Sequence, residues 1–347
     1  MYSAGGVRWV GANGALTNCK FTNNIANTYG GGICWVGANG SISSSTFTNN
    51  IANVNEGGGV EWSGINVTLT NSTFINNTAK SNGGGVSMSG INGILSDSTF
   101  INNTAIYLGG GAFIGADNCI LKHSNFTHNI GSHGAGIYWR DANGTLFNSV
   151  FINNIAGGNA GGAFFDSENG TLKDSIFTNN IANGNAGAAC LGHSNIILSG
   201  STFINNTSKQ NGGGVYWLAT GNNCTLMDST FINNTANVWG GGIFWSGANG
   251  TLTTSTFTSN TAGTNGGAIY WRVTGSMTNC IFNNNKMIKS NGIYVLDNLT
   301  INGGKGIVDI VTSTQSTISG TSIVVLNNET YYYPPNANIN LIDLTAV

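Results

Sequence analysis

The chain has 347 residues, of which 53 are glycine, only two are proline, and 7% are charged. Its net charge of −2 comes with no basic stripe, so nucleic acid is not an expected partner. No apolar run approaches the ~20 residues of a membrane helix, and residues 1–7 lack the charged and apolar regions of a secretion signal. We therefore expect part of a longer protein, whose export signal and anchor lie outside this chain.

A repeat of about 26 residues begins at the N-terminus and continues to Lys286. Such a density of Gly and Asn would cost a helix ~1 kcal/mol per glycine, and the apolar positions alternate with period two. Three short segments per unit, separated by Gly/Asn turns, are typical of stacked strands. The sequence thus predicts an all-β protein, a right-handed, single-stranded parallel β-helix (solenoid) of about eleven coils with three strands per coil.

Four repeat positions are predicted to point inward and to stack from coil to coil. The first is mostly tryptophan: Trp9, Trp35, Trp62, Met88, Ile114, Trp139, Phe165, Leu191, Trp217, Trp245 and Trp271. The second is aliphatic: Leu16, Ile42, Leu69, Leu95, Leu121, Leu146, Leu172, Leu198, Leu226, Leu252 and Met277. The third is phenylalanine: Phe21, Phe47, Phe74, Phe100, Phe126, Phe151, Phe177, Phe203, Phe231, Phe257 and Phe282. The fourth is a structural asparagine ladder: Asn24, Asn50, Asn77, Asn103, Asn129, Asn154, Asn180, Asn206, Asn234, Asn260 and Asn285.

The C-terminal part departs from this period. Residues 1–286 are assigned to the repeats, residues 287–326 to terminal coils that cap the stack, and residues 327–347 to a linker or the start of a following domain. The strands of the terminal coils are expected around seven apolar residues: Ile293, Ile301, Ile307, Ile310, Ile323, Val325 and Leu326.

Two motifs of the unit resemble a known group of surface proteins. Gly-Gly-Ala-Ile at 266–269 and Phe-x-x-Asn at 257–260 and 47–50 resemble the repeats of chlamydial polymorphic outer membrane proteins. The whole unit, with Asn-Asn-x-Ala and the Tyr-Tyr-Pro-Pro-Asn tail, looks similar to adhesin-like surface proteins of methanogenic archaea over residues 5–340. Both resemblances imply a β-helical segment at the cell surface that serves adhesion or display.

The six cysteines are predicted to be free thiols. Cys19 and Cys280 share one ladder position, as do Cys34 with Cys190 and Cys119 with Cys224. The nearest pair is four coils apart, ~19 Å, beyond the ~7 Å Cα separation that a disulfide tolerates. In an exported protein, free thiols indicate an anaerobic setting or a scaffold that is stable without disulfides.

Sequons for N-glycosylation recur along the chain, so a glycoprotein is one open interpretation; Asn- and Thr-rich turns also generate such sequons by composition alone. They are Asn39, Asn66, Asn71, Asn76, Asn102, Asn125, Asn143, Asn169, Asn205, Asn206, Asn223, Asn233, Asn249, Asn298 and Asn328.

Two residues before each member of the tryptophan ladder, most coils carry an Ile or Val that is also predicted to point inward. The residue between these two positions is predicted to face outward and to form an exposed aromatic stripe. Early coils carry Arg8, Cys34, Glu61 and Ser87 there, and Cys190 interrupts the later aromatic residues. Aromatic faces along a rigid rod could stack on sugar rings or anchor a protein partner, although they could also simply stabilise the strands. The candidate binding residues are Phe113, Tyr138, Phe164, Tyr216, Phe244 and Tyr270.

An enzyme of the carbohydrate-active β-helix type is the runner-up interpretation, because such lyases and hydrolases need clustered carboxylates and often an arginine. The best cluster is Arg140, Asp141, Asp166 and Glu168, in which Arg140 and Asp166 should stack on adjacent coils. A surface ion pair would explain the same residues without catalysis.

Two further sets of residues were weighed for function. His123, His128 and His133 fall in one coil, but parity places His123 outside and His128 inward, so a shared metal is not expected. Outward Thr and Ile residues beside each Phe form a remote ice-binding alternative, interrupted by Lys20, Asn125 and Asn283. The Thr/Ile pairs include Thr46 with Thr48, Thr73 with Ile75, Thr99 with Ile101, Thr202 with Ile204, Thr230 with Ile232 and Thr256 with Thr258.

The sequence therefore predicts a non-enzymatic, extracellular adhesin-like or surface-display segment. We expect it to bind cell-surface glycans or surface proteins, without a cofactor, a metal ion or a membrane span of its own.

Overall fold

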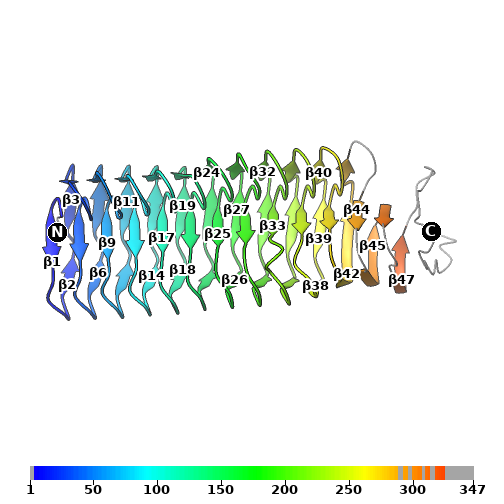
Figure 1. The fold of residues 1–347 in the computed structure, drawn as a ribbon, viewed down its shortest axis with the longest axis horizontal. Helices are drawn as coiled ribbons and strands as arrows, with labels where there is room; N and C mark the ends of the chain where they lie inside the picture. The colour runs from blue at the N-terminus through cyan, green and yellow to red at the C-terminus, as the bar shows by residue number, and fades with distance from the viewer. Residues whose placement is uncertain (1–3, 288–291, 296–298, 307–308, 313–316, 325–347) are drawn as a thin grey trace.

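The computed structural model of the chain describes residues 4–287, 292–295, 299–306, 309–312 and 317–324. The chain winds into a parallel β-helix, with successive coils stacked along one axis (Figure 1). Strands pair in parallel with the equivalent strand one coil away, as Val7 of β1 (Val7–Trp9) does with Ile33 of β5 (Ile33–Trp35). The prediction of an all-β solenoid with coils of about 26 residues is confirmed.

Three sheets run along the rod. The first sheet contains β1, β5, β9 (Val60–Trp62), β13 (Val86–Met88), β17 (Ala112–Ile114), β21 (Ile137–Trp139), β25 (Ala163–Phe165), β29 (Ala189–Leu191), β33 (Val215–Trp217), β37 (Ile243–Trp245), β41 (Ile269–Trp271), β44 (Gly292–Val295) and β46 (Asp309–Thr312). The third sheet contains β4 (Ile25–Ala26), β8 (Ile51–Ala52), β12 (Thr78–Ala79), β16 (Thr104–Ala105), β20 (Ile130–Gly131), β24 (Ile155–Ala156), β28 (Ile181–Ala182), β32 (Thr207–Ser208), β36 (Thr235–Ala236), β40 (Thr261–Ala262) and β43 (Lys286–Met287).

The second sheet receives two short strands from most coils. It contains β2 (Ala15–Thr17), β3 (Lys20–Thr22), β6 (Ser41–Ser43), β7 (Thr46–Thr48), β10 (Thr68–Thr70), β11 (Thr73–Ile75), β14 (Ile94–Ser96), β15 (Thr99–Ile101), β18 (Ile120–Lys122), β19 (Asn125–Thr127), β22 (Thr145–Phe147), β23 (Val150–Ile152), β26 (Thr171–Lys173), β27 (Ile176–Thr178), β30 (Ile197–Ser199), β31 (Thr202–Ile204), β34 (Thr225–Met227), β35 (Thr230–Ile232), β38 (Gly250–Thr253), β39 (Thr256–Thr258), β42 (Gly275–Asn283), β45 (Leu299–Gly306) and β47 (Thr317–Val324).

Residues in the left-handed backbone conformation divide the strands of each coil. Asn71 separates β10 from β11 with φ 48°, and Asn76 separates β11 from β12 with φ 54°. Asparagine adopts this region more readily than most residues because its short amide makes local hydrogen bonds. The recurrence of these bends in each coil explains much of the asparagine content.

The three predicted apolar ladders fill the interior, and they are buried from the second coil onward. Neighbouring phenylalanine rings are stacked nearly parallel, with ring centroids 4.6 Å apart for Phe100 and Phe126 and 4.7 Å apart for Phe47 and Phe74. This stacking follows from the coil spacing of ~4.8 Å, which suits aromatic contact. The inward assignment of the tryptophan, aliphatic and phenylalanine positions is therefore correct.

The asparagine ladder forms a hydrogen-bonded column, of which Asn103 is representative. Its Nδ2 donates to Asn129 Oδ1 at 3.1 Å and to the Phe74 carbonyl at 3.0 Å. Its Oδ1 accepts from both Nδ2 and the backbone N–H of Asn77, each at 3.0 Å. The side chain is fully buried, so these bonds satisfy polar groups that have no access to water.

The stack continues past the regular repeats. Ile293 of β44 pairs in register with Ile269, and Ile301 of β45 pairs with Met277. Ile310 lies in β46 and Ile323 in β47. The remaining predicted strand residues of the terminal coils, Ile307, Val325 and Leu326, and the proposed linker at 327–347 lie outside the described residues.

Candidate functional site

The aromatic stripe predicted on the outer face of the first sheet is not exposed. Phe113, Tyr138, Phe164, Phe244 and Tyr270 retain only 1–7% of their accessible surface. Tyr216 is the exception, with intermediate exposure. These side chains do point away from the main core, but the prediction that they form an open binding surface is wrong.

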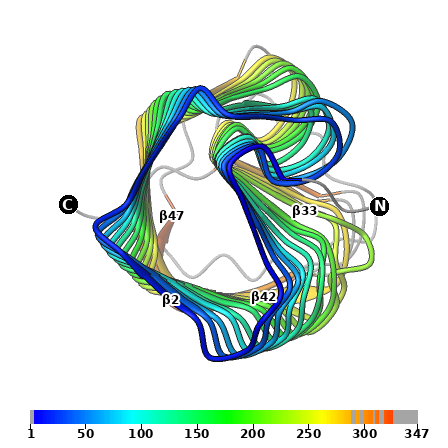
Figure 2. The ribbon, with the colours of Figure 1, turned by 90° about the vertical axis from the view of Figure 1, so that its left-hand side faces the viewer.

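The covering layer is the turn that leads from the third sheet into the first. Figure 2 shows this segment swinging outward and folding back before it enters β33 and its equivalents. Leu108 and the alanines Ala160 and Ala186 pack from this turn on the aromatic ladder. Trp239 stacks on Tyr270 with ring centroids 5.2 Å apart. The outer aromatic residues therefore form a second apolar layer, and substitution by serine would damage the fold.

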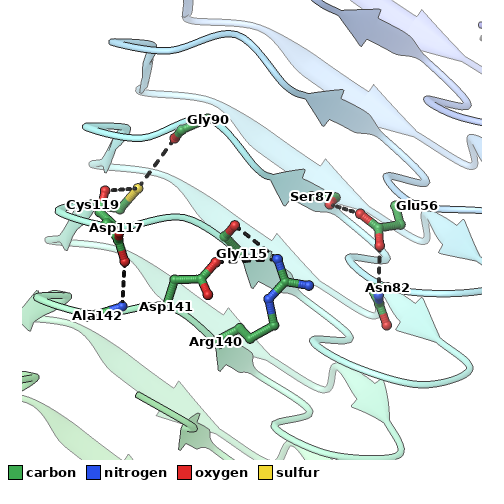
Figure 3. A network of polar contacts seen from close by, with 10 residues as sticks. All are labelled: Glu56, Asn82, Ser87, Gly90, Gly115, Asp117, Cys119, Arg140, Asp141 and Ala142. Atoms are coloured by element: carbon green, nitrogen blue, oxygen red, sulfur yellow. Dashed lines mark hydrogen bonds and ion pairs between the residues drawn. The ribbon is translucent and has the colours of Figure 1, made fainter. Parts of the chain in front are cut away.

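Toward the N-terminus, the same turn covers a polar group of side chains. Glu61 is 4% exposed, and Cys34 donates a hydrogen bond to its Oε2 at 3.1 Å. Burial, the largest cause, and the nearby Glu56 raise the pKa of Glu61 to about 7. Glu56 accepts hydrogen bonds from Ser87 Oγ at 2.7 Å and from Asn82 Nδ2 at 2.8 Å (Figure 3). Burial and Glu61 raise the pKa of the Cys34 thiol to about 12. The thiol therefore stays protonated at neutral pH and is a poor nucleophile.

The four residues of the enzyme interpretation lie in the turns between the first and second sheets. Arg140 and Asp166 follow the paired residues Trp139 and Phe165, so they stack on adjacent coils as predicted. The ion pair of Arg140, however, is with Asp141, at 3.4 Å. Its guanidinium also donates to the Gly115 carbonyl at 3.3 Å (Figure 3).

Asp166 instead joins two residues from the neighbouring coils. The Tyr138 hydroxyl donates to Asp166 Oδ2 at 2.5 Å, and His193 Nε2 lies 3.2 Å from Asp166 Oδ1. Burial and Asp166 raise the pKa of the Tyr138 hydroxyl, which keeps it a hydrogen-bond donor at neutral pH. The sequence reasoning missed His193; the signal that could have found it is the departure of its turn from the Gly-Ala-Asn-Gly pattern of other coils.

The three histidines of the fifth coil do not come together at one point. His123 lies 3.4 Å from Asp97 and His128 lies 3.2 Å from Asn153 Nδ2. The inward placement of His128 is wrong, because its side chain is exposed and the following Asn129 occupies the buried ladder. His133 lies in the turn over the outer aromatic residues, where burial lowers its pKa. Among the described residues, no group of three or more His, Cys, Asp or Glu side chains is arranged to hold a metal ion.

Other sequence candidates have clear positions. All six cysteines are free, as predicted. The sequon residue Asn206 belongs to the buried ladder, whereas Asn205 is exposed; Asn298 and Asn328 fall outside the described part of the chain. The Thr and Ile pairs beside the phenylalanines lie on the outer face of the second sheet with intermediate exposure.

The fold defines the protein as a parallel β-helix in which the inward side chains of each coil stack on the equivalent side chains of the next. Residues 110–286, about half of the chain, match the right-handed β-helix region, and the protein belongs to this family. This match also confirms the predicted right-handed coil. Residues 71–89 match the repeat of the Chlamydia polymorphic membrane protein, in agreement with the resemblance of the motifs.

No curated protein matches the chain. The two family matches suggest an adhesin-type region of a surface protein, without identifying its ligand. Within the part that the structure describes, no helix is long and apolar enough to cross a membrane.

Proposed function

We propose that the protein is a non-enzymatic, extracellular adhesin-type rod that binds glycans or proteins on a partner surface. The observation that carries this proposal is the unbroken stack of in-register coils, together with the match to a surface-protein repeat. Eleven coils at ~4.8 Å each give a rod about 50 Å long. A rigid rod of this kind holds a binding surface at a fixed distance from its attachment point.

The contacts of the best candidate catalytic cluster favour a non-catalytic role. Both carboxylate oxygens of Asp166 are engaged, by Tyr138 and by His193. The Tyr138 hydroxyl has a raised pKa and holds its proton. An efficient acid or base needs a pKa near the working pH and reach to a substrate, which favours a binding role for these groups.

The test is a glycan array probed with the purified chain, run beside reducing-sugar and unsaturated-product assays on polysaccharides. Binding without turnover supports the adhesin. Turnover overturns it in favour of the carbohydrate-active alternative, for which Arg140, Asp141, Asp166 and Glu168 would be the residues to replace. The proposal is also overturned if the chain binds none of the glycans on the array and no cell surface.

A further inference from the structure

The repeats provide an internal comparison for the turn between the first and second sheets. In the coils at 36–40, 89–93 and 246–250 this turn is uncharged and reads x-Gly-(Ala/Ile)-Asn-Gly. In four successive coils, at 115–119, 140–144, 166–170 and 192–196, it carries charged and polar residues instead. We call the second set the polar turns.

The polar turns keep the backbone of the uncharged ones. Asn39 of an uncharged turn has φ 54°, and Asn143 and Asn169 of the polar turns have φ 60° and 56°. The exposed asparagine side chains are also linked from coil to coil in both sets, as Asn39 is to Asn13 and Asn143 is to Asn118. Since the uncharged sequence closes the same connection, folding does not require the charged side chains of the polar turns.

The polar turns present hydrogen-bonding groups of several kinds on three adjacent coils. Tyr138, Asp166 and His193 form the linked set described above, with Asp166 and His193 side chains 36% and 47% exposed. The Glu168 side chain is exposed, and no hydrogen bond or ion pair engages it within the described residues. Between these two carboxylates lies Ser167, which is 4% exposed and whose hydroxyl has no protein partner. The Glu168 carboxylate therefore offers unused hydrogen-bond acceptors at the surface of this turn, and the Ser167 hydroxyl lies beneath that surface as an unsatisfied buried group.

The preceding coil adds a cationic group to the same face. Arg140 is held over the Phe113 ring, 5.4 Å from its centroid, and its side chain stays 53% exposed. Asp117 Oδ1 accepts from the Ala142 backbone N–H at 2.8 Å, which fixes this turn against its neighbour (Figure 3). The polar turns contain one guanidinium, that of Arg140, and four carboxylates: Asp117, Asp141, Asp166 and Glu168. The net charge of the polar turns is therefore −3 when histidine is neutral.

We propose that the polar turns of residues 115–196 form a binding site for an uncharged glycan chain. This inference rests on the proposed function and specifies where its ligand binds. Carboxylate, imidazole, guanidinium and hydroxyl groups together both donate to and accept from sugar hydroxyls. Coils ~4.8 Å apart repeat such groups at a spacing similar to that of successive sugars in an extended chain. The net negative charge disfavours uronic acid polymers, because like charges repel.

The experiment grafts the uncharged turn of residues 246–248 into the polar turns. One variant combines Arg140→Ser with Asp141→Gly, and a second combines Asp166→Ser, Ser167→Gly and Glu168→Ala with Tyr138→Phe. Each graft reproduces residues that the chain already uses at equivalent positions: Ser246, Gly247 and Ala248, with Phe244 in place of the tyrosine. The grafts are therefore expected to fold, which thermal unfolding checks.

Binding is measured by calorimetry with cellohexaose, chitohexaose, mannohexaose and a galacturonate hexamer. We expect the unmodified chain to bind at least one neutral hexasaccharide more tightly than the galacturonate, and the second graft to weaken that binding at least tenfold. Asp174→Asn, in the exposed turn between the two strands of the second sheet, is the matched control and should bind as the unmodified chain does.

The outcomes separate this site from the proposed function. Equal glycan binding by the folded grafts overturns the site while the adhesin survives. Preference for galacturonate overturns the ligand class. Failure of the unmodified chain to bind any of the hexasaccharides overturns the inference, and the wider glycan array and cell-binding tests then decide the proposed function separately.

Discussion

Gly40 lies directly against the indole ring of Trp35. A Cβ atom at Gly40 would be 2.6 Å from Cε2 of that ring, closer than atoms of a folded core approach. Gly144 and Gly250 stand in the same relation to Trp139 and Trp245. Where the inward residue is the smaller Leu191, the corner residue is instead Ile196, and both are fully buried. In these coils, bulk is exchanged between two positions five residues apart. The third coil differs, because buried Val67 follows Trp62, whose ring is tilted by 32° against that of Trp35.

This relation predicts that paired substitutions compensate. Gly40→Ile in the presence of Trp35 should destabilise the fold by about 3 kcal/mol or more, because the added side chain overpacks the corner. Trp35→Leu alone should cost about 3 kcal/mol through the cavity that it leaves. The double variant, which copies Leu191 and Ile196, should recover much of both losses. Denaturant unfolding of the four proteins measures the coupling, and strictly additive losses would contradict the relation.

The asparagine ladder predicts a large effect for a small change. Asn103→Ala breaks four hydrogen bonds. The Asn77 backbone N–H and Nδ2, the Phe74 carbonyl and Asn129 Oδ1 each lose Asn103 as a partner. Buried polar groups left unsatisfied cost ~1–3 kcal/mol each, so the loss should be about 3 kcal/mol or more. The midpoint of denaturant unfolding gives the measurement.

The neighbouring residue supplies the control for the ladder. Asn102 has φ 53° and an exposed side chain, and glycine tolerates this backbone conformation. Asn102→Gly should therefore change stability by less than about 1 kcal/mol. Similar losses for the two variants would show that the buried hydrogen bonds contribute little.

Much of the fold could be predicted because the sequence repeats. The recurrence of Phe47, Phe74 and Phe100 at spacings of 27 and 26 residues gives the coil length, and alternation within each strand separates inward from outward side chains. A parallel β-helix stacks equivalent residues, so one correct coil determines the others. The interior ladders follow from that rule alone.

The outer face of the first sheet could not be predicted in the same way. Alternation places Tyr138 and Phe244 outside the main core, but it says nothing about a turn that folds back over them. That covering depends on long-range packing by residues such as Leu108 and Trp239, at a position that is asparagine in several other coils, for example Asn185. The link from Asp166 to His193 was missed for a related reason: the repeat predicts which turns stack, but the side chains of these turns differ from coil to coil, so the repeat does not predict their contacts.

The buried carboxyl of Glu61 predicts a pH dependence of stability. Its pKa in the folded protein is about 7, above the ordinary value of 4.5. The contribution of the protonated Glu61 side chain to the free energy of unfolding is thus fully present below about pH 4.5. It is lost as the pH rises through about 7. Glu61→Gln keeps an acceptor for Cys34 but cannot ionise, so at pH 8 it should be more stable than the unmodified chain, by on the order of 3 kcal/mol.

Unfolding midpoints of both proteins between pH 4 and pH 8 measure this difference, with Glu168→Gln as the exposed control. We expect the difference in unfolding midpoint from the unmodified chain to increase with rising pH for Glu61→Gln and to stay nearly constant for Glu168→Gln. A difference for Glu61→Gln that does not depend on pH would contradict the raised pKa of Glu61.

The thiols predict a simple reactivity pattern. Cys34, Cys119, Cys190, Cys224 and Cys280 are buried, and burial raises the pKa of Cys119 and of Cys280 to about 11. Cys19 in the first coil is partly exposed. Since the thiolate is the reactive form, a disulfide reagent such as Ellman's should modify Cys19 first in the native protein and all six thiols after denaturation. Cys19→Ser should abolish the fast native reaction; a second fast thiol in that variant would show that a buried coil opens in solution.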